Sequence, residues 1–315
     1  MNGEPRVGVV VLTHERPAEL AHCLAQLVAL PERPAIVVVD NGTRGGVAEV
    51  VARHPGVTLV RSDRNRGAAG RNLGVGVLDT PYVAFCDDDT WWAPGALTRA
   101  LALLDAFPRI GALSARVLVG PEQQPDPTCA VMAASPLARE GLPGPRLVSF
   151  MAGAAVIRTQ AFREAGGYEP RLFLGAEEPL LALEMAARGW VIVYADEVVT
   201  HHHPSAARDL LSRRRLLARN RLWLAWLRLP WPLALRDTLA VLREARAAGV
   251  AAVALRAALA GLPWVLAQRR RVPAAVAEDW RRVHHGAEAA SVSRRGSGLR
   301  PASPAAPPDA RRHVR

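Results

Sequence analysis

The sequence predicts an α/β fold for its first 200 residues, where short β-branched runs alternate with segments of helical periodicity. The run at 35–39 is apolar throughout, which is typical of a strand buried on both faces of a parallel sheet. The apolar run at 82–86 leads directly into three aspartates. Because open α/β sheets bind ligands at the carboxyl ends of their strands, we expect a polar site at these strand ends.

Strands and helices follow one another regularly in this part of the chain. The predicted strands are runs rich in Val, Ile and other apolar residues, at 7–12, 35–39, 57–61, 82–86, 110–119, 151–158 and 191–194. The predicted helices have apolar residues at helical spacing, at 17–29, 68–78, 96–106 and 178–188. Pro17 favours a helix start, because the first turn does not need its missing N–H group. The segment 120–148 contains six prolines and is predicted to be a long loop.

Charge divides the chain into two parts. Residues 1–200 carry 18 Arg and 22 acidic residues, whereas residues 201–315 carry 22 Arg and 7 acidic residues. We therefore predict a first domain at 1–204, followed by an Arg- and Trp-rich helical region at 205–285 with a helix at 208–227 and one or two helices over 233–267. The stretch 286–315 is dominated by Ser, Pro, Ala, Gly and Arg and is predicted to be a disordered tail.

Several protein classes are excluded by what the sequence lacks. All 40 basic residues are arginine, so neither a P-loop lysine nor a Schiff-base lysine has a candidate; a GC-rich coding sequence would account for this. No G-x-G-x-x-G follows the first predicted strand, which excludes the dinucleotide-binding fingerprint. The three cysteines form no CxxC pair, and no apolar stretch reaches the ~20 residues of a spanning helix. With no secretory signal visible, we expect a cytoplasmic protein.

The predicted strand ends deliver polar residues to one edge of the sheet. Thr13 and Arg16 follow the first strand, Asp40 follows the second, and the acidic run 87–89 follows the fourth. A solvated turn is the alternative for such a run, but consecutive carboxylates after a buried strand are costly unless they are paired or bound to a cation. Hard oxygen ligands favour Mg²⁺ or Mn²⁺, which often bridges carboxylates to substrate phosphates.

The ordered motifs of this chain resemble those of family 2 glycosyltransferases. They are Thr13-His14-Glu15-Arg16-Pro17, Val39-Asp40-Asn41-Gly42, Asn65-Arg66-Gly67 with Arg71-Asn72, Asp87-Asp88-Asp89, Gly153-Ala154, Gly167-Tyr168, Glu177-Glu178 and the run His201–His203. The resemblance covers about residues 5–205. It implies a GT-A fold and transfer of a sugar from a nucleotide diphosphate donor, with inversion at the anomeric carbon. The Gln-x-x-Arg-Trp signature of processive synthases is absent, which favours a non-processive enzyme that adds one sugar.

Carried over position by position, the resemblance implies a nucleotide-binding role for four residues. Asp40 corresponds to the acid that hydrogen-bonds the nucleobase, and a carboxylate suits the imide N–H of uracil or thymine. Thr13 and Arg16 correspond to positions that line the nucleotide, although Arg16 could equally be a surface charge at a helix start. Arg71 corresponds to a basic position near the base or the phosphates.

The resemblance also implies a divalent metal ion, Mn²⁺ or Mg²⁺. Asp89 corresponds to the metal ligand of the DxD motif. Asp87 corresponds to an acid that binds the ribose or a metal-bound water and is a second candidate metal ligand. Asp88, between them, is a further candidate for nucleotide-sugar binding. A histidine after the last strand can ligate the metal in related enzymes, which makes His203 and His201 candidates. The alternative for the histidine run is a polar strand-exit loop.

Glu177 and Glu178 are the candidates for the catalytic base. The family usually has Glu-Asp here, and the second acid deprotonates the acceptor hydroxyl. Glu178 stands in that place with one extra methylene, so either glutamate could serve. The alternative is that both are only helix-start acids, which the helix dipole favours.

We therefore predict a metal-assisted inverting glycosyltransferase that uses a UDP- or dTDP-sugar and a glycan or lipid-linked acceptor. The alternatives are a non-catalytic nucleotide-sugar-binding module and a nucleotidyltransferase. For 205–285, one interpretation is peripheral contact with the inner face of the cell membrane, and the other is a bundle packed on the catalytic domain or within a homo-oligomer. Nucleic-acid binding is disfavoured, because no aromatic residues are interleaved with the arginines after Trp280.

Overall fold

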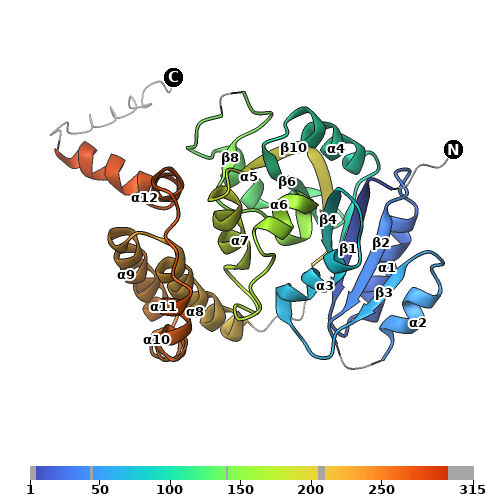
Figure 1. Ribbon diagram of the computed structural model, residues 1–315, viewed down its shortest axis with the longest axis horizontal. Helices are drawn as coiled ribbons and strands as arrows, with labels where there is room; N and C mark the ends of the chain where they lie inside the picture. The colour runs from blue at the N-terminus through green and yellow to red at the C-terminus, as the bar shows by residue number, and fades with distance from the viewer. Residues whose placement is uncertain (1–4, 43–44, 140, 205–209, 297–315) are drawn as a thin grey trace, which may run out of the picture.

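The structure of the chain is a computed structural model that describes residues 5–42, 45–139, 141–204 and 210–296 (Figure 1). Its strands are β1 Val7–Thr13, β2 Ala35–Asp40, β3 Thr58–Arg61, β4 Tyr82–Asp87, β5 Thr90–Trp92, β6 Ile110–Val119, β7 Gln124–Pro125, β8 Arg146–Leu147, β9 Ala155–Arg158 and β10 Val191–His202. The helices of the catalytic domain are α1 Pro17–Val28, α2 Val47–Ala52, α3 Arg71–Gly76, α4 Ala96–Ala106, α5 Pro127–Ala133, α6 Thr159–Glu164 and α7 Glu177–Ala186, with 3-10 turns at Gly67–Gly70 and Ala152–Ala154. The C-terminal helices are α8 Leu210–Arg228, α9 Trp231–Ala247, α10 Ala251–Ala260, α11 Leu262–Ala267 and α12 Ala274–Gly296.

The strands form one mixed sheet in the order β3-β2-β1-β4-β9-β6-β10-β5, with β7 paired to β6 and β8 paired to β10. The first four strands of this order are parallel, as the apolar runs predict. Strand β9 is antiparallel to both of its neighbours, β4 and β6. The prediction of an α/β sheet is confirmed, and its parallel half places the carboxyl ends of β1, β2 and β4 side by side.

Each face of the sheet is covered by its own layer of helices. Alternation along β1 sends Val9 and Val11 into the cluster that includes α1 and α4, and Val10 into the cluster that includes α6 and α7. The cysteines Cys23, Cys86 and Cys129 are buried and unpaired in these layers, as their spacing predicts.

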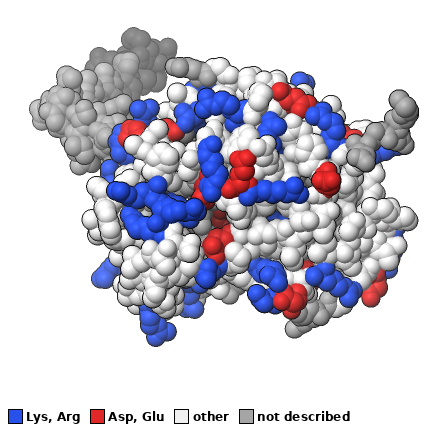
Figure 2. All heavy atoms as spheres, in the orientation of Figure 1, with Lys and Arg blue, Asp and Glu red and all other residues white. Residues whose placement is uncertain are grey.

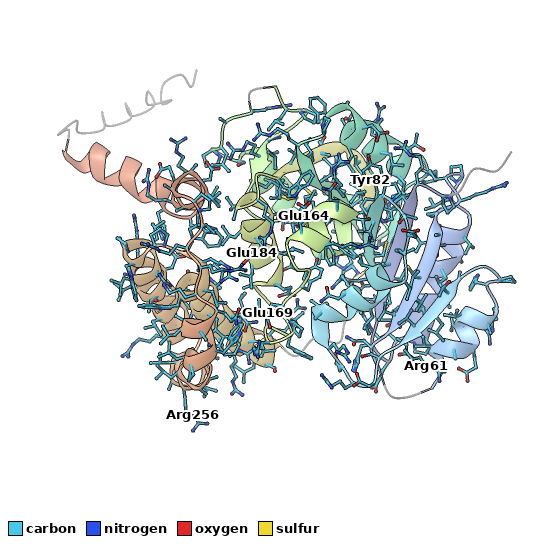
Figure 3. The ribbon with its side chains drawn as sticks, viewed as in Figure 1. Arg61, Tyr82, Glu164, Glu169, Glu184 and Arg256 are labelled. Atoms are coloured by element: carbon cyan, nitrogen blue, oxygen red, sulfur yellow. The ribbon has the colours of Figure 1, made fainter. Side chains whose placement is uncertain are left out.

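The C-terminal helices form a bundle that packs against α7 (Figure 1). A third hydrophobic cluster joins Leu180 and Leu183 of α7 to residues of α8, α9, α10 and α12. Glu184 of α7 (Figure 3) is ion-paired with Arg228 and with Arg270, which lie in and beside the bundle. The described part of this region, 210–285, therefore packs on the catalytic domain. Among the described residues, no helix combines the length and apolar character that crossing a bilayer requires.

Several predicted boundaries are corrected by the structure. The last strand does not end at residue 194 but continues as β10 to His202; the exposed acids Asp196 and Glu197 lie at an irregularity in its pairing with β6 and hide the strand pattern. The predicted loop 120–148 contains α5, which begins where Asp126 caps the helix by accepting a hydrogen bond from the backbone N–H of Thr128 at 2.8 Å.

In the C-terminal third, the segment 233–267 belongs to three helices, α9 to α11, instead of one or two. The tail predicted from residue 286 also begins too early, because α12 runs to Gly296 through a stretch rich in alanine, the strongest helix former. The rest of that tail, 297–315, lies outside the described residues. The short elements α2, β5 and α6 were not predicted, since so few residues carry no clear periodicity.

Candidate active site

The polar residues at the strand ends meet as predicted. Thr13 on β1 lies opposite Asp40 on β2, and Leu12 lies opposite Asp87 on β4. The loops that follow these strands line a cavity of about 1840 Å³ that extends from the strand ends past α7 to α8 and α12. The cavity receives Thr13, Arg16, Arg71 and the three aspartates 87–89 from the predicted site.

Arg16 binds two of the three aspartates. The Thr13 hydroxyl donates a hydrogen bond to Asp88 Oδ2 at 2.8 Å, and Arg16 Nε donates to the same oxygen at 3.1 Å. Arg16 Nη1 donates to Asp89 Oδ2 at 3.1 Å. Burial raises the pKa of Asp88 to about 7 despite the neighbouring guanidinium. Arg16 is thus part of the site and not an unrelated surface charge.

Asp87 belongs to a second ion pair at the same edge. Its carboxylate is paired with Arg71, whose side chain is almost completely buried. The Arg71 guanidinium carbon lies 5.9 Å from the ring centre of Phe85 and 5.7 Å from that of Tyr168, so two aromatic faces flank the cation. This packing fixes Arg71 beside the cavity.

Two of the three histidines contact Asp89: the side chain of His202 approaches its carboxylate, and the backbone N–H of His203 donates to its carbonyl at 2.9 Å. His202 Nε2 lies 3.6 Å from Asp89 Oδ1 and lines the large cavity. His201 and His203 line a separate pocket of about 480 Å³ with Trp91, and His201 Nδ1 hydrogen-bonds Gln123. Successive side chains of a strand point to opposite faces, which explains why the middle histidine differs from its neighbours. Of the run His201–His203, His202 is therefore the residue whose side chain shares the large cavity with Asp89.

The donor set at Asp89 and His202 is chemically suited to Mn²⁺ or Mg²⁺. A carboxylate is a preferred ligand of both ions, and imidazole is the commonest metal ligand in proteins. In the described part of the chain, no group of three His, Cys, Asp or Glu side chains is placed to hold a metal ion. Such ions usually complete their coordination with water and substrate phosphates, so two protein ligands are compatible with a metal that arrives with a diphosphate.

Asp40 lies at the border of the cavity and not on its wall. Its Oδ1 accepts a hydrogen bond from the backbone N–H of Gly42 at 3.1 Å, while its neighbours Thr13 and Asn41 line the cavity. Asn41 Nδ2 donates to Asn65 Oδ1 and to the carbonyl of Gly67, both at 3.0 Å. The amide of Asn41 therefore fixes the loop that leads to Arg71.

Glu177 and Glu178 form the first turn of α7 and line the same cavity. Glu177 is 3% exposed, and its Oε2 has no hydrogen-bond partner. Burial raises the pKa of Glu177, and burial together with the charge of Glu177 raises the pKa of Glu178 to about 8. Glu177 is buried and Glu178 is half-buried, so the pair is not a fully solvated helix start. Acids with raised pKa values that face a cavity can accept a proton from a bound ligand.

The loop in front of α7 is held from both sides. Ala68 N donates a hydrogen bond to the carbonyl of Phe173 at 2.7 Å, and a Cβ on Gly67 would lie 1.9 Å from that oxygen. From the other side, the buried amide of Asn220 on α8 donates to the carbonyls of Leu172, Leu174 and Gly175 at 2.7, 3.0 and 2.6 Å. The catalytic acids are therefore positioned by the C-terminal bundle as well as by the nucleotide loops.

Sequence reasoning left the choice within the run His201–His203 open and missed Asn220. Strand alternation could have singled out His202, because the strand continues through the histidine run. No local pattern identifies Asn220, since its three acceptors lie more than 40 residues away along the chain.

The mixed sheet flanked by helices has the GT-A glycosyltransferase fold. Solved structures share the fold: the mannosyltransferase PcManGT from Pyrobaculum calidifontis, in complex with GDP-Man and Mn²⁺, has a TM-score of 0.56 at 22% identity and is aligned over 85% of both chains. GalNAc-T7 with UDP, GalNAc and Mn²⁺ has a TM-score of 0.52 at 15% identity, over 70% of this chain and 48% of its own.

The sequence profile named Glycosyl transferase family 2 matches residues 8–165, half of the chain, and the chain belongs to this family. The N-acetylglucosaminyl-diphospho-decaprenol L-rhamnosyltransferase of Mycobacterium tuberculosis is 27% identical over 241 residues, which cover 64% of this chain and 78% of that protein. The pre-mycofactocin glycosyltransferase of the same species is 26% identical over 201 residues, covering 61% of this chain and 42% of that protein. The protein is a glycosyltransferase, which decides against the nucleotidyltransferase and non-catalytic alternatives.

Proposed function

We propose that this enzyme transfers one sugar, with inversion, from a UDP- or dTDP-sugar to a hydroxyl group of a lipid-diphosphate-linked glycan. The observation that carries the proposal is the acid pair of buried Glu177 and half-buried Glu178, which lines the same cavity as the strand-end acids. The rhamnosyltransferase that the chain resembles acts, by its name, on an N-acetylglucosaminyl-diphospho-decaprenol acceptor, which supports this acceptor class.

The mechanism is a single displacement at the anomeric carbon. One glutamate of the pair accepts the proton of the acceptor hydroxyl as its oxygen attacks the anomeric carbon from the side opposite the diphosphate. The sugar–phosphate bond breaks, and the nucleoside diphosphate leaves with the bonding electron pair. Thr13 and Asp40 are assigned to the nucleoside, and Arg71 to the positioning of Asp87. Asp89 and His202 would hold Mn²⁺ or Mg²⁺, which acts as a Lewis acid toward a departing diphosphate.

The direct test is a donor screen with purified protein and Mn²⁺. We expect a UDP- or dTDP-sugar to raise the melting temperature, and the matching nucleoside diphosphate to be released when a prenyl-diphosphate-linked N-acetylglucosamine is added. Release of pyrophosphate instead would contradict sugar transfer. The proposal is also refuted if no nucleoside diphosphate shifts the melting temperature, with or without the metal.

We also propose that the C-terminal bundle contacts an anionic membrane surface. Trp231, Leu235 and Leu239 follow one another at four-residue spacing on α9 and are 50%, 53% and 63% exposed. The guanidinium carbon of Arg269 lies 4.5 Å from the centre of the Trp231 ring. Arg256 lies at the outer end of the bundle (Figure 3). Figure 2 shows arginines gathered on the side of the molecule where the bundle lies. An exposed apolar stripe bordered by arginines suits the interface of anionic lipids.

Replacing the stripe by serine in Trp231→Ser/Leu235→Ser/Leu239→Ser is expected to lower binding to anionic phosphatidylglycerol vesicles at least about tenfold, because each side chain loses its apolar transfer energy. Vesicle flotation of the full chain measures this. The control is Val28→Ser/Val77→Ser, which changes two exposed valines of the catalytic domain. Equal flotation of both variants would defeat the docking proposal.

A further inference from the structure

The cavity is larger than the strand-end acids need, and its far part is lined by other elements. Beyond Glu177 and Glu178 its wall comes from α5, α8, α9 and α12. None of these elements carries a residue of the predicted nucleotide-sugar site. This part of the cavity therefore lies on the side of the catalytic acids from which an acceptor would approach.

Two arginines in this part of the cavity are unpaired. Arg213 and Arg214, near the start of α8, line the cavity and are exposed, and neither has an ion pair or side-chain hydrogen bond with any residue in the described part of the chain. Other arginines of the same helix are neutralised, since Arg221 pairs with Glu244 and Arg228 with Glu184. Arg213 and the acid pair line the same cavity, and the charge of Arg213 lowers the pKa of Glu177, against the larger effect of burial.

The same wall exposes apolar side chains. Val131 on α5 is 71% exposed, Leu217 on α8 is 42% exposed, and Val283 on α12 is 36% exposed, and all three line the cavity. They come from three separate elements, so the apolar surface is assembled by the tertiary fold and not by one amphipathic helix. A ligand that matches this wall carries an anionic group and an apolar chain.

The geometry points to an acceptor subsite in which Arg213 and Arg214 bind the diphosphate of the acceptor and the apolar wall receives the first part of its lipid chain. Guanidinium groups bind phosphate oxygens with paired, charge-assisted hydrogen bonds. Because these arginines and the acid pair line one cavity, a sugar bound directly to the diphosphate would present its hydroxyl group toward the acid pair. The donor diphosphate is assigned elsewhere, to the edge of the sheet with Arg16, Asp87 and Asp89. This inference rests on the proposed acceptor class and adds the residues that recognise it.

The test is a binding measurement that needs no turnover. Full-length protein is saturated with Mn²⁺ and UDP or dTDP, so that the donor position is filled, and is then titrated calorimetrically with farnesyl diphosphate below its micelle concentration. We expect Arg213→Ala/Arg214→Ala to weaken this binding about tenfold or more, from the loss of two charge-assisted contacts. The matched control is Arg215→Ala, the next arginine of α8, which is exposed but does not line the cavity; it should bind within about twofold of the wild type.

Two further ligands separate the contributions. Inorganic pyrophosphate should bind more weakly than farnesyl diphosphate but with the same dependence on the two arginines, and farnesol should show no such dependence. Unchanged binding of farnesyl diphosphate to the double variant would overturn the inference. An equal loss of UDP or dTDP binding in the double variant would also overturn it, by assigning the arginines to the donor. Arginine-dependent binding without any sugar transfer would refute the proposed function while supporting the subsite.

Discussion

Replacing Glu177 and Glu178 together by glutamine is expected to lower the rate of sugar transfer about 10²–10⁴-fold, the usual contribution of a general base. Glutamine keeps the shape of the side chain but cannot accept the proton. Donor binding should persist, because the nucleotide residues lie at the strand ends and not on α7. Steady-state transfer and the thermal shift with UDP or dTDP measure the two effects separately, and the single variants show which glutamate is the base.

The matched control is Glu164→Gln on α6, an exposed glutamate outside the cavity (Figure 3). It should transfer sugar at nearly the wild-type rate. Wild-type turnover by the double variant, with donor binding intact, would contradict catalysis by the pair.

The raised pKa of Glu178 gives this prediction a pH dependence. A base must be ionised, so wild-type kcat/KM should rise with pH and level off above about 8. The charge of Glu177 contributes to this raised pKa, so Glu177→Gln should move the inflection to lower pH if Glu178 is the base. An inflection that stays in place in Glu177→Gln would argue against the coupling of the two acids.

Stability should change in the opposite direction from activity. A carboxyl group whose pKa is raised by folding is protonated more in the native than in the unfolded state between its two pKa values, so stability falls as pH rises from about 4.5 to about 8. Glu178→Gln removes this effect. The variant should therefore melt at a higher temperature than the wild type at pH 9 and at nearly the same temperature at pH 5.

The second large effect is expected at the other end of the cavity. Asp89→Asn should abolish the Mn²⁺-dependent thermal shift with nucleoside diphosphate and lower transfer about 10³-fold, because a divalent ion contributes several kcal/mol toward the departing diphosphate. His202→Ala should lower transfer about tenfold, and added Mn²⁺ should partly restore it, since one ligand is lost and one is kept.

The histidines next to His202 provide the control. His201→Ala changes the neighbouring position on β10, whose side chain lies in the separate pocket with Trp91. It should leave the Mn²⁺ dependence unchanged. A larger effect of His201→Ala than of His202→Ala would contradict the assignment of the metal-binding histidine.

The sheet and the acids at its edge were predictable because their signals are local. A buried strand is an apolar run, and its carboxyl end is marked by the first polar residues after it, as at Asp40 and Asp87. The sequence could not decide among the histidines because Asp196 and Glu197 interrupt the apolar run, so the strand seemed to end before the residues whose side chains alternate between its two faces.

The acceptor side was not predictable in the same way. Arg213 is one of many arginines in the C-terminal third, and only the fold shows that it lines the cavity while Arg221 and Arg228 are paired. Its role depends on contacts between α8 and a loop far away in the sequence. Composition identified this region as basic and helical but could not say which cations face a ligand.

The hydrogen bonds of Asn220 have a consequence for protein engineering. One residue of α8 fixes the backbone that leads to the acid pair, so a C-terminal region exchanged between two enzymes of this family would bring a new support for the catalytic loop along with a new acceptor surface. Chimeras joined in the connection before α8 should lose turnover even when both parents are active. If residues 172–175 are transferred together with the bundle, the loop keeps its own support. Chimeras built in that way should exchange acceptor preference without losing turnover.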